Sequence, residues 1–233
     1  YNAIKGKDSR DSTTVSPAEP KRKEFKKGSL KGLVLGVPKE YFVDGMDPDV
    51  ESTVRKAIKV CEGLGAEIKE VSLPTSGYGL AVYYIIMPAE VSANLSRYDG
   101  IRYGYSAKEA KNLLDVYLKS REEGLGAEVR RRIMIGAYVL SSGYYDAYYR
   151  KAQKVRTLVR RDFLKVFQDV DALLTPTSPG VAWKIGERTS DPLSMYLSDI
   201  YTVSANVAGI PAISLPCGFA HGLPVGLQIM GRH

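Results

Sequence analysis

The sequence has few of the residues from which metal and thiol sites are built. Its 233 residues include two cysteines and two histidines. Cys61 and Cys217 lie far apart in apolar surroundings, which favours free thiols as small core residues over a disulfide framework. Only Cys217 and His221 are close in sequence, and two ligands do not make a structural zinc site. We therefore expect no metal site, and we expect His221 and His233 on the surface or in loops.

Long hydrophobic runs and standard catalytic motifs are also missing. No apolar run approaches the roughly 18 residues of a membrane span, and the polar first 20 residues lack the apolar core of a signal peptide. The sequence contains no G-x-S-x-G elbow, S-x-x-K motif, Gly-rich phosphate loop or H-E-x-x-H helix. We therefore expect a cytoplasmic protein with no membrane partner, and no catalytic residue within this chain.

The composition is that of a globular protein with a basic excess. Hydrophobic residues make up 44% and charged residues 25% of the chain, which is enough apolar material for a core. The net charge of +7 is concentrated at residues 150–165, where seven Lys/Arg face one Asp. Such a helix could bind RNA or an acidic partner. A solvated helix face is the interpretation we favour, because no aromatic residues interleave the charges.

The residue pattern predicts an α/β fold, with a mixed β-sheet core flanked by helices. An apolar strand at 33–37 is followed by a helix with Asp47 as N-cap and Pro48 in its first turn, and then by a strand at 68–73. This order is a βαβ unit, which implies a parallel strand pair. The polar residues 1–27 read as a linker, and residues 28–233 read as the ordered domain.

Further elements follow from periodicity, caps and turn residues. A capping box of Ser106 and Glu109 predicts the start of a helix that ends at Gly124. Other elements are expected further along the chain: helices over 126–143, 144–170 and 191–211, a buried strand from 171, and a β-hairpin over 212–231.

Two charged residues stand in otherwise apolar helical segments. Arg132, the last of three consecutive arginines, lies near the helix side that carries Gly136. Asp199 lies between Leu197 and Ile200. Solvated or capping roles are the common alternatives for such residues. An Arg and an Asp that faced one cleft would instead match the two charged ends of a free α-amino acid.

Several long segments of the sequence resemble segments of a known protein family. "NVAGIPAISLPCG" (206–218), "DALLTPTSP" (171–179) and "DPLSMYLSDIYT" (191–202) resemble the amidase signature family. Together with "RRRIMIGAYVLSSGYYDAYYRKAQKVR" (130–156), they are similar to the A subunits of glutamyl-tRNA(Gln) and aspartyl-tRNA(Asn) amidotransferases. The resemblance implies an amidase signature fold that is incomplete in this chain. Residues 28–233 would be the C-terminal part of the core domain, and the linker 1–27 would follow a missing catalytic segment.

The resemblance also implies a function. Such proteins are glutaminases that hydrolyse glutamine and supply ammonia for converting Glu-tRNA(Gln) to Gln-tRNA(Gln) and Asp-tRNA(Asn) to Asn-tRNA(Asn). The implied partners are amidotransferase subunits B and C, with misacylated tRNA bound mainly through the partner subunit. That partner would hold ATP and Mg²⁺, so no cofactor is expected in this chain. The alternatives are a stand-alone amidase of small or acyl amides, or a non-catalytic interaction module when the chain is isolated.

The same resemblance assigns roles to three residues. The family's arginine for the α-carboxylate of glutamine falls on Arg132, and its acidic residue for the α-ammonium falls on Asp199. A tyrosine that lines the pocket falls on Tyr83. The run of three arginines leaves Arg131 as the competitor for the carboxylate. The family's Ser-Ser-Lys catalytic triad has no counterpart in these residues.

Overall fold

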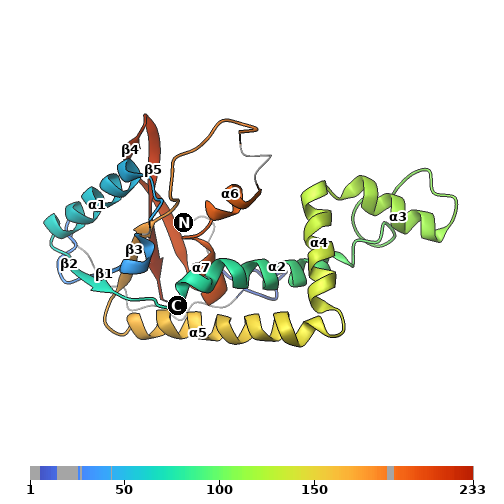
Figure 1. Ribbon diagram of the computed structural model, residues 1–233, viewed down its shortest axis with the longest axis horizontal. Coiled ribbons are helices and arrows are strands. Elements are labelled where there is room, and N and C mark those ends of the chain that lie inside the picture. The colour runs from blue at the N-terminus through green and yellow to red at the C-terminus, as the bar shows by residue number, and fades with distance from the viewer. Residues whose placement is uncertain (1–5, 15–25, 27, 43, 188–191, 233) are drawn as a thin grey trace.

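The computed structural model describes residues 6–14, 26, 28–42, 44–187 and 192–232, with the side chains of 192–194 excluded. A five-stranded mixed sheet with strand order β2-β1-β3-β5-β4 forms one end of the molecule, and helices extend away from it (Figure 1). The expected α/β architecture, a mixed sheet flanked by helices, is confirmed. The predicted linker over residues 1–27 lies largely outside the described residues and stays a prediction.

The first two strands form the expected βαβ unit. Strand β1 (Val34–Pro38) pairs in parallel with β2 (Glu67–Val71), and α1 (Pro48–Gly63) connects them. The Asp47 carboxylate accepts hydrogen bonds from the backbone N–H groups of Asp49 at 2.8 Å and Val50 at 3.3 Å. The predicted N-cap and the helix that follows it are therefore confirmed.

The other half of the sheet is antiparallel. Strand β3 (Ala172–Pro176) pairs in parallel with β1 and antiparallel with β5 (Leu223–Gly231), which forms a hairpin with β4 (Ala212–Ala220). The hairpin turns at His221 and Gly222, whose φ angles are +53° and +76°. Positive φ at both central residues suits the right-handed twist of a two-residue hairpin. The predicted hairpin is confirmed.

Glycine and proline residues within 206–218 occupy positions in the structure that favour them. Gly209 ends α7 (Val203–Ala208) with a φ of +71°, a left-handed cap that glycine adopts at low cost. Pro216 lies where the register of β4 against β5 shifts, and β4 is an edge strand of the sheet in this chain. Edge strands and irregular registers are the places where a strand tolerates proline.

Four helices and a π-helix form a projection that we call the helical arm, residues 79–166 (Figure 1). Its elements are α2 (Gly79–Leu95), α3 (Leu113–Gly124), α4 (Ala127–Leu140), the π-helix Tyr145–Arg150 and α5 (Lys151–Val166). Helices α2 and α4 approach so closely that a Cβ on Gly136 would lie 1.9 Å from the carbonyl oxygen of Pro88. No helix among the described residues has the length and apolarity needed to cross a membrane.

The predicted capping box at Ser106 and Glu109 is wrong. Helix α3 begins at Leu113, and its N-cap is Asn112, whose side chain accepts a hydrogen bond from the N–H of Asp115 at 2.9 Å. The segment before it folds back on the helix instead, with the N–H of Ala107 donating to Ser120 Oγ at 2.9 Å. The helix is therefore capped at Asn112, later than predicted, and the backbone of Ala107 is held by Ser120 outside any helix.

The long helix expected over 191–211 is also wrong in its extent. It is divided into α6 (Pro192–Leu197) and α7, with turns at residues 198–202 between them. Ser198 Oγ donates to the Met195 carbonyl at 2.5 Å, and Thr202 Oγ1 donates to the Asp199 carbonyl at 3.1 Å. Such side-chain bonds to the backbone compete with the helical ladder. The two helices expected over 126–143 and 144–170 end earlier, at 140 and 166.

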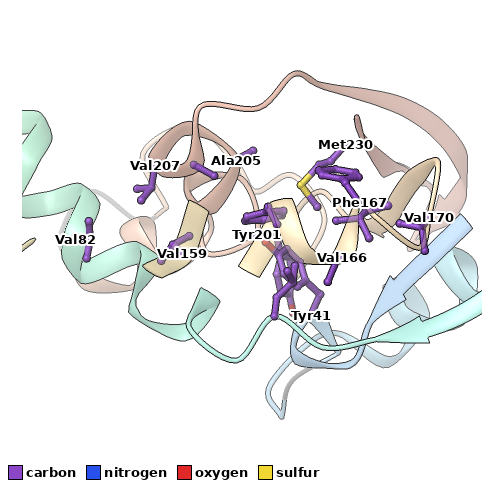
Figure 2. Close-up of a cluster of buried hydrophobic side chains, with 14 of the residues drawn as sticks. Tyr41, Val82, Val159, Val166, Phe167, Val170, Tyr201, Ala205, Val207 and Met230 are labelled. Atoms are coloured by element: carbon purple, nitrogen blue, oxygen red, sulfur yellow. The ribbon is translucent and has the colours of Figure 1, made fainter. Parts of the chain in front are cut away.

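The principal core lies where the helices meet the sheet (Figure 2). Tyr41 and Tyr201 stack with their ring centroids 5.6 Å apart, and both are 2% exposed. Val159 of α5 and Met230 of β5 belong to the same cluster and are fully buried. This packing joins the C-terminal strands to the base of the helical arm.

Candidate amino-acid-binding site

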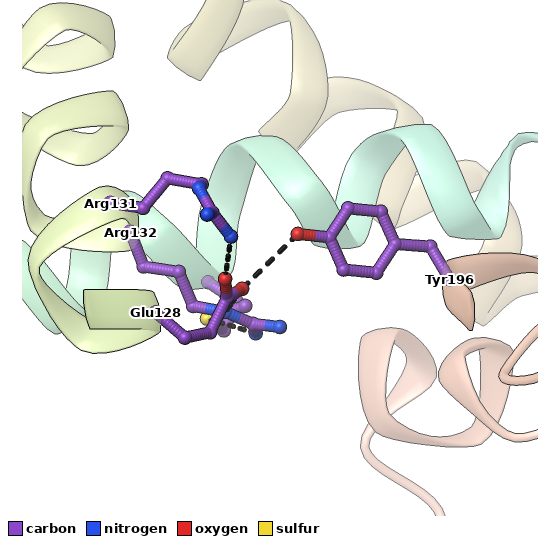
Figure 3. A network of polar contacts seen from close by, with 5 residues as sticks. Glu128, Arg131, Arg132 and Tyr196 are labelled. Carbon is purple, nitrogen blue, oxygen red and sulfur yellow. Dashed lines mark hydrogen bonds and ion pairs between the residues drawn. The ribbon is translucent and has the colours of Figure 1, made fainter. Parts of the chain in front are cut away.

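The Glu128 carboxylate is the centre of a polar network in the first turn of α4 (Figure 3). Arg132 Nε donates to Glu128 Oε1 at 2.8 Å, and Arg131 Nη1 donates to Glu128 Oε2. The hydroxyl of Tyr196, from α6, also donates to Glu128 Oε1 at 3.1 Å. The network therefore connects two side chains that are 68 residues apart in sequence.

The two candidate arginines have different environments. The Arg132 side chain is 26% exposed, whereas that of Arg131 is 55% exposed. The Arg132 guanidinium carbon lies 5.6 Å from the ring centroid of Tyr84 and 6.0 Å from that of Tyr196, and Nη1 lies 3.5 Å from Met87 Sδ. A half-buried arginine beside aromatic faces is better placed to bind a ligand than a solvated one. The geometry favours Arg132 over Arg131.

Three tyrosine rings pack against one another beside Arg132. The ring centroids of Tyr84 and Tyr196 are 4.5 Å apart, and Tyr83 meets Tyr84 edge to face at 5.2 Å. The Tyr84 hydroxyl is buried and has no hydrogen-bond partner among the described residues. Burial raises the pKa of Tyr84 to about 12, with the Arg132 charge opposing this shift and the Asp199 charge adding to it. Both charged residues therefore influence one tyrosine.

The structure thus places two of the three predicted residues, Arg132 and Tyr83, in contact with the Tyr84 ring. Arg132 and Tyr83 lie on neighbouring helices, α4 and α2, and Tyr83 is in direct ring contact with Tyr84. Asp199 lies in the turn after α6, three residues beyond Tyr196. Within the described residues, no direct hydrogen bond or ion pair joins Arg132 to Asp199. Asp199 therefore does not neutralise Arg132 by direct contact.

The charge states in the network are well defined. The hydrogen bond from Arg132 is the main cause that lowers the pKa of Glu128, and the Tyr196 hydroxyl contributes to this shift. Burial alone would lower the pKa of Arg132, but the hydrogen bond and charge of Glu128 outweigh it and raise the pKa. Glu128 is therefore an anion and Arg132 a cation at neutral pH.

Sequence reasoning missed Glu128 and Tyr196. The spacing of four residues between Glu128 and Arg132 is the usual signal for an ion pair on one helix face, so Glu128 could have been found. Tyr196 gives no such signal, because its contact depends on how α6 packs against α4.

A cavity of ≈ 620 Å³ adjoins this region on the side of the sheet. Leu197 and Ser198, which directly precede Asp199, line one part of it, and Trp183 and Lys184 line another. The turn that carries Asp199 therefore borders open space that a small molecule could enter.

One group of potential metal ligands occurs among the described residues. Single oxygen or nitrogen atoms of Asp47, Asp49 and His221 lie within 4.8 Å of one another. Asp47 already caps α1, and its Oδ2 lies 2.9 Å from His221 Nε2. The contacts of this exposed group are accounted for by the helix cap and the ion pair, and we assign no metal to it. His221 lies at an exposed turn, as expected.

Comparison with known proteins identifies the class. The Amidase family matches residues 1–233, and the chain therefore belongs to the amidase family. Over 232 residues it is 60% identical to the A subunit of glutamyl-tRNA(Gln) amidotransferase from Caldanaerobacter subterraneus, covering 100% of this chain and 48% of that protein. It is 58% identical over 226 residues to the protein of the same name from Myxococcus xanthus, covering 97% and 46%.

A solved structure agrees with this result. The crystal structure of the glutamyl-tRNA(Gln) amidotransferase A subunit from Thermotoga maritima matches with a TM-score of 0.70 and 40% identity, covering 98% of this chain and 44% of that one. The resemblance read from the sequence is thus confirmed. The chain spans about half the length of the relatives it matches.

Proposed function

We propose that the complete protein is the glutaminase subunit of a tRNA-dependent amidotransferase. It hydrolyses glutamine to glutamate and ammonia, and the ammonia serves to convert Glu-tRNA(Gln) to Gln-tRNA(Gln), and also Asp-tRNA(Asn) to Asn-tRNA(Asn). Relatives that are 53% to 60% identical to this chain and are named as the A subunit of glutamyl-tRNA(Gln) amidotransferase support this proposal.

The observation that carries the proposal is the half-buried Arg132 guanidinium beside the Tyr84 ring, with the Asp199 charge acting on the same tyrosine. Arg132 binds the α-carboxylate of glutamine, Asp199 binds its α-ammonium, and Tyr83 lines the pocket between them. A guanidinium presents a planar fork that matches a carboxylate, and a carboxylate accepts the three N–H groups of an ammonium. An amide substrate with no charged ends would not need this pair.

The remaining roles belong to other parts of the assembly. A Ser-Ser-Lys triad in the rest of the protein carries out the nucleophilic attack on the amide, and backbone N–H groups stabilise the oxyanion. Partner subunits B and C complete a cytoplasmic complex, in which the partner subunit holds ATP and Mg²⁺ and binds most of the misacylated tRNA. This chain supplies the side of the site that recognises the amino acid.

The test is ammonia release from glutamine by the complete protein with its partner subunits. We expect Arg132→Met to raise the KM for glutamine about a hundredfold, because it leaves the substrate carboxylate without its partner. Arg131→Met is the matched variant, and we expect a KM close to that of the unmodified enzyme. A large effect of Arg131→Met with none of Arg132→Met would move the carboxylate site by one residue.

The alternatives predict other outcomes. A stand-alone amidase would hydrolyse butyramide as well as glutamine, and Arg132→Met would change neither. An interaction module would bind the partner subunits as an isolated chain and release no ammonia from glutamine.

A further inference from the structure

We infer that Glu128 is a positioning residue for glutamine binding: it fixes the orientation of the Arg132 guanidinium and its spacing from Asp199. This inference rests on the proposed function, because it gives Arg132 the substrate carboxylate as its ligand. It adds a residue that determines specificity through Arg132 and does not itself touch the substrate.

The first argument concerns which edge of the guanidinium is free. Arg132 donates from Nε to Glu128 at 2.8 Å, and Nη1 lies 3.5 Å from the sulfur of Met87. Nη2 donates to no residue within the described part of the chain. Because a guanidinium is rigid and planar, fixing Nε fixes the direction of the two terminal nitrogens. A substrate carboxylate would then bind at the Nη1–Nη2 edge, away from the negative charge of Glu128.

The second argument concerns what holds Glu128. Its side chain is 44% exposed, so burial does not immobilise it. Both carboxylate oxygens are instead engaged, Oε1 by Arg132 and Tyr196 and Oε2 by Arg131. Glu128 also lies in the first turn of α4, where the helix dipole favours a negative charge. A carboxylate with donors on both oxygens has little rotational freedom.

The third argument concerns the spacing of the two charged ends of the site. Tyr196 lies in α6, and Asp199 follows three residues later in the adjoining turn. The hydrogen bond from Tyr196 to Glu128 therefore ties the segment that carries Asp199 to the helix that carries Arg132. A single carboxylate thus sets both the direction of the cation and its separation from the anion, which together select a free α-amino acid.

The test uses the complete protein with its partner subunits and measures KM and kcat for glutamine. Glu128→Gln keeps the length of the side chain and removes its charge. We expect it to raise the KM roughly tenfold, as for loss of a hydrogen bond between charged groups, and to leave kcat within about twofold. Tyr196→Phe keeps the ring and removes only the hydroxyl, so we expect a smaller rise of about threefold.

The matched control is Glu51→Gln on α1. Glu51 also pairs with an arginine four residues later, with Arg55 Nε 2.7 Å from Oε1. This variant makes the same chemical change in a helical pair far from Arg132, and we expect an unchanged KM. A general loss of structure in Glu128→Gln would lower kcat and the Tm of the complex together with the affinity, and would overturn a positioning role.

The outcomes separate this inference from the proposed function. If Arg132→Met raises the KM but Glu128→Gln leaves it unchanged or lowers it, Glu128 does not position Arg132, and the proposed function stands. If Arg132→Met itself leaves the KM unchanged, Arg132 does not bind the carboxylate, and both assignments fail.

Discussion

The central strand of the sheet and the outer helices of the helical arm, α3 and α4, bury their apolar residues to very different extents. In the sheet, β3 contributes Leu173 and Leu174 at 0% and 1% exposure. In the arm, Met134 of α4 is 72% exposed and Leu114 of α3 is 65% exposed. Strand β3 lies inside the core, whereas α3 and α4 of the arm, like the edge strand β4 with Phe219 at 73% exposure, carry apolar surface that the described residues do not cover.

This difference explains what holds each part together. The sheet end is stabilised by burial spread over many side chains, so its stability follows from the hydrophobic pattern. The outer helix α4 of the arm depends more on a few specific contacts, such as the close approach of Gly136 to Pro88 and the hydrogen bonds of Glu128. Substitutions at these two kinds of position should therefore have distinct effects.

The largest effect is expected from cavity formation in the sheet. Leu173→Ala removes a fully buried side chain and should lower the free energy of unfolding by about 2–5 kcal/mol. Leu118→Ala, at a position 58% exposed on α3, should change it by less than about 0.5 kcal/mol. Denaturant titration of both variants measures this contrast. Equal losses would mean that the surface of the arm is as tightly packed as the sheet core.

An intermediate effect is expected where the helices of the arm cross. Gly136→Ala places a methyl group 1.9 Å from the Pro88 carbonyl oxygen, so α4 must move away from α2. We expect a loss of about 1–3 kcal/mol in the free energy of unfolding, from overpacking. The movement would also displace Arg132, one turn earlier on α4, and should raise the KM for glutamine in the complete enzyme.

The control variant for Gly136→Ala is a glycine substitution at the sheet end. Gly63 is the last residue of α1, and a Cβ there would meet nothing within 4 Å. Gly63→Ala should therefore be neutral, or stabilising by up to about 1 kcal/mol. A neutral Gly136→Ala would show that the two helices are not in firm contact.

The smallest effect is expected at the exposed hairpin turn. The hydrogen bond and charge of Asp47 raise the pKa of His221 above its ordinary value of 6.5. Because the folded-state pKa is the higher one, this stabilisation is complete below pH 6.5 and is lost as the pH rises through the folded-state pKa. His221→Asn removes the titrating ring and tolerates the positive φ.

Tm measured between pH 6 and pH 9 tests this contact. The unmodified protein should lose Tm relative to His221→Asn as the pH rises across this range. Asp49→Asn is the control, because it retains the hydrogen bond between Asp47 and His221 and should keep most of the pH dependence. Parallel curves for the unmodified protein and His221→Asn would show that the contact contributes nothing to stability.

The sequence predicted the sheet end well and the arm less well, for a physical reason. The Asp47 cap and the turn at His221 and Gly222 are formed by neighbouring residues, so local chemistry is sufficient to find them. The start of α3 was mistaken, since the contact of Ala107 with Ser120 is set by tertiary folding. Outside the arm, the break after α6 was also hidden, because Ser198 and Thr202 are compatible with a helix.

The amino acids alone determined the fold class, the helix and strand types at the sheet end, and the family to which the chain belongs. They also singled out Arg132, Asp199 and Tyr83 through their match to family motifs. Only the tertiary structure decided which arginine is half-buried beside Tyr84, and that Tyr196 reaches Glu128. The physical reason is that the orientation of a side chain depends on partners from distant segments, which no spacing within one helix can specify.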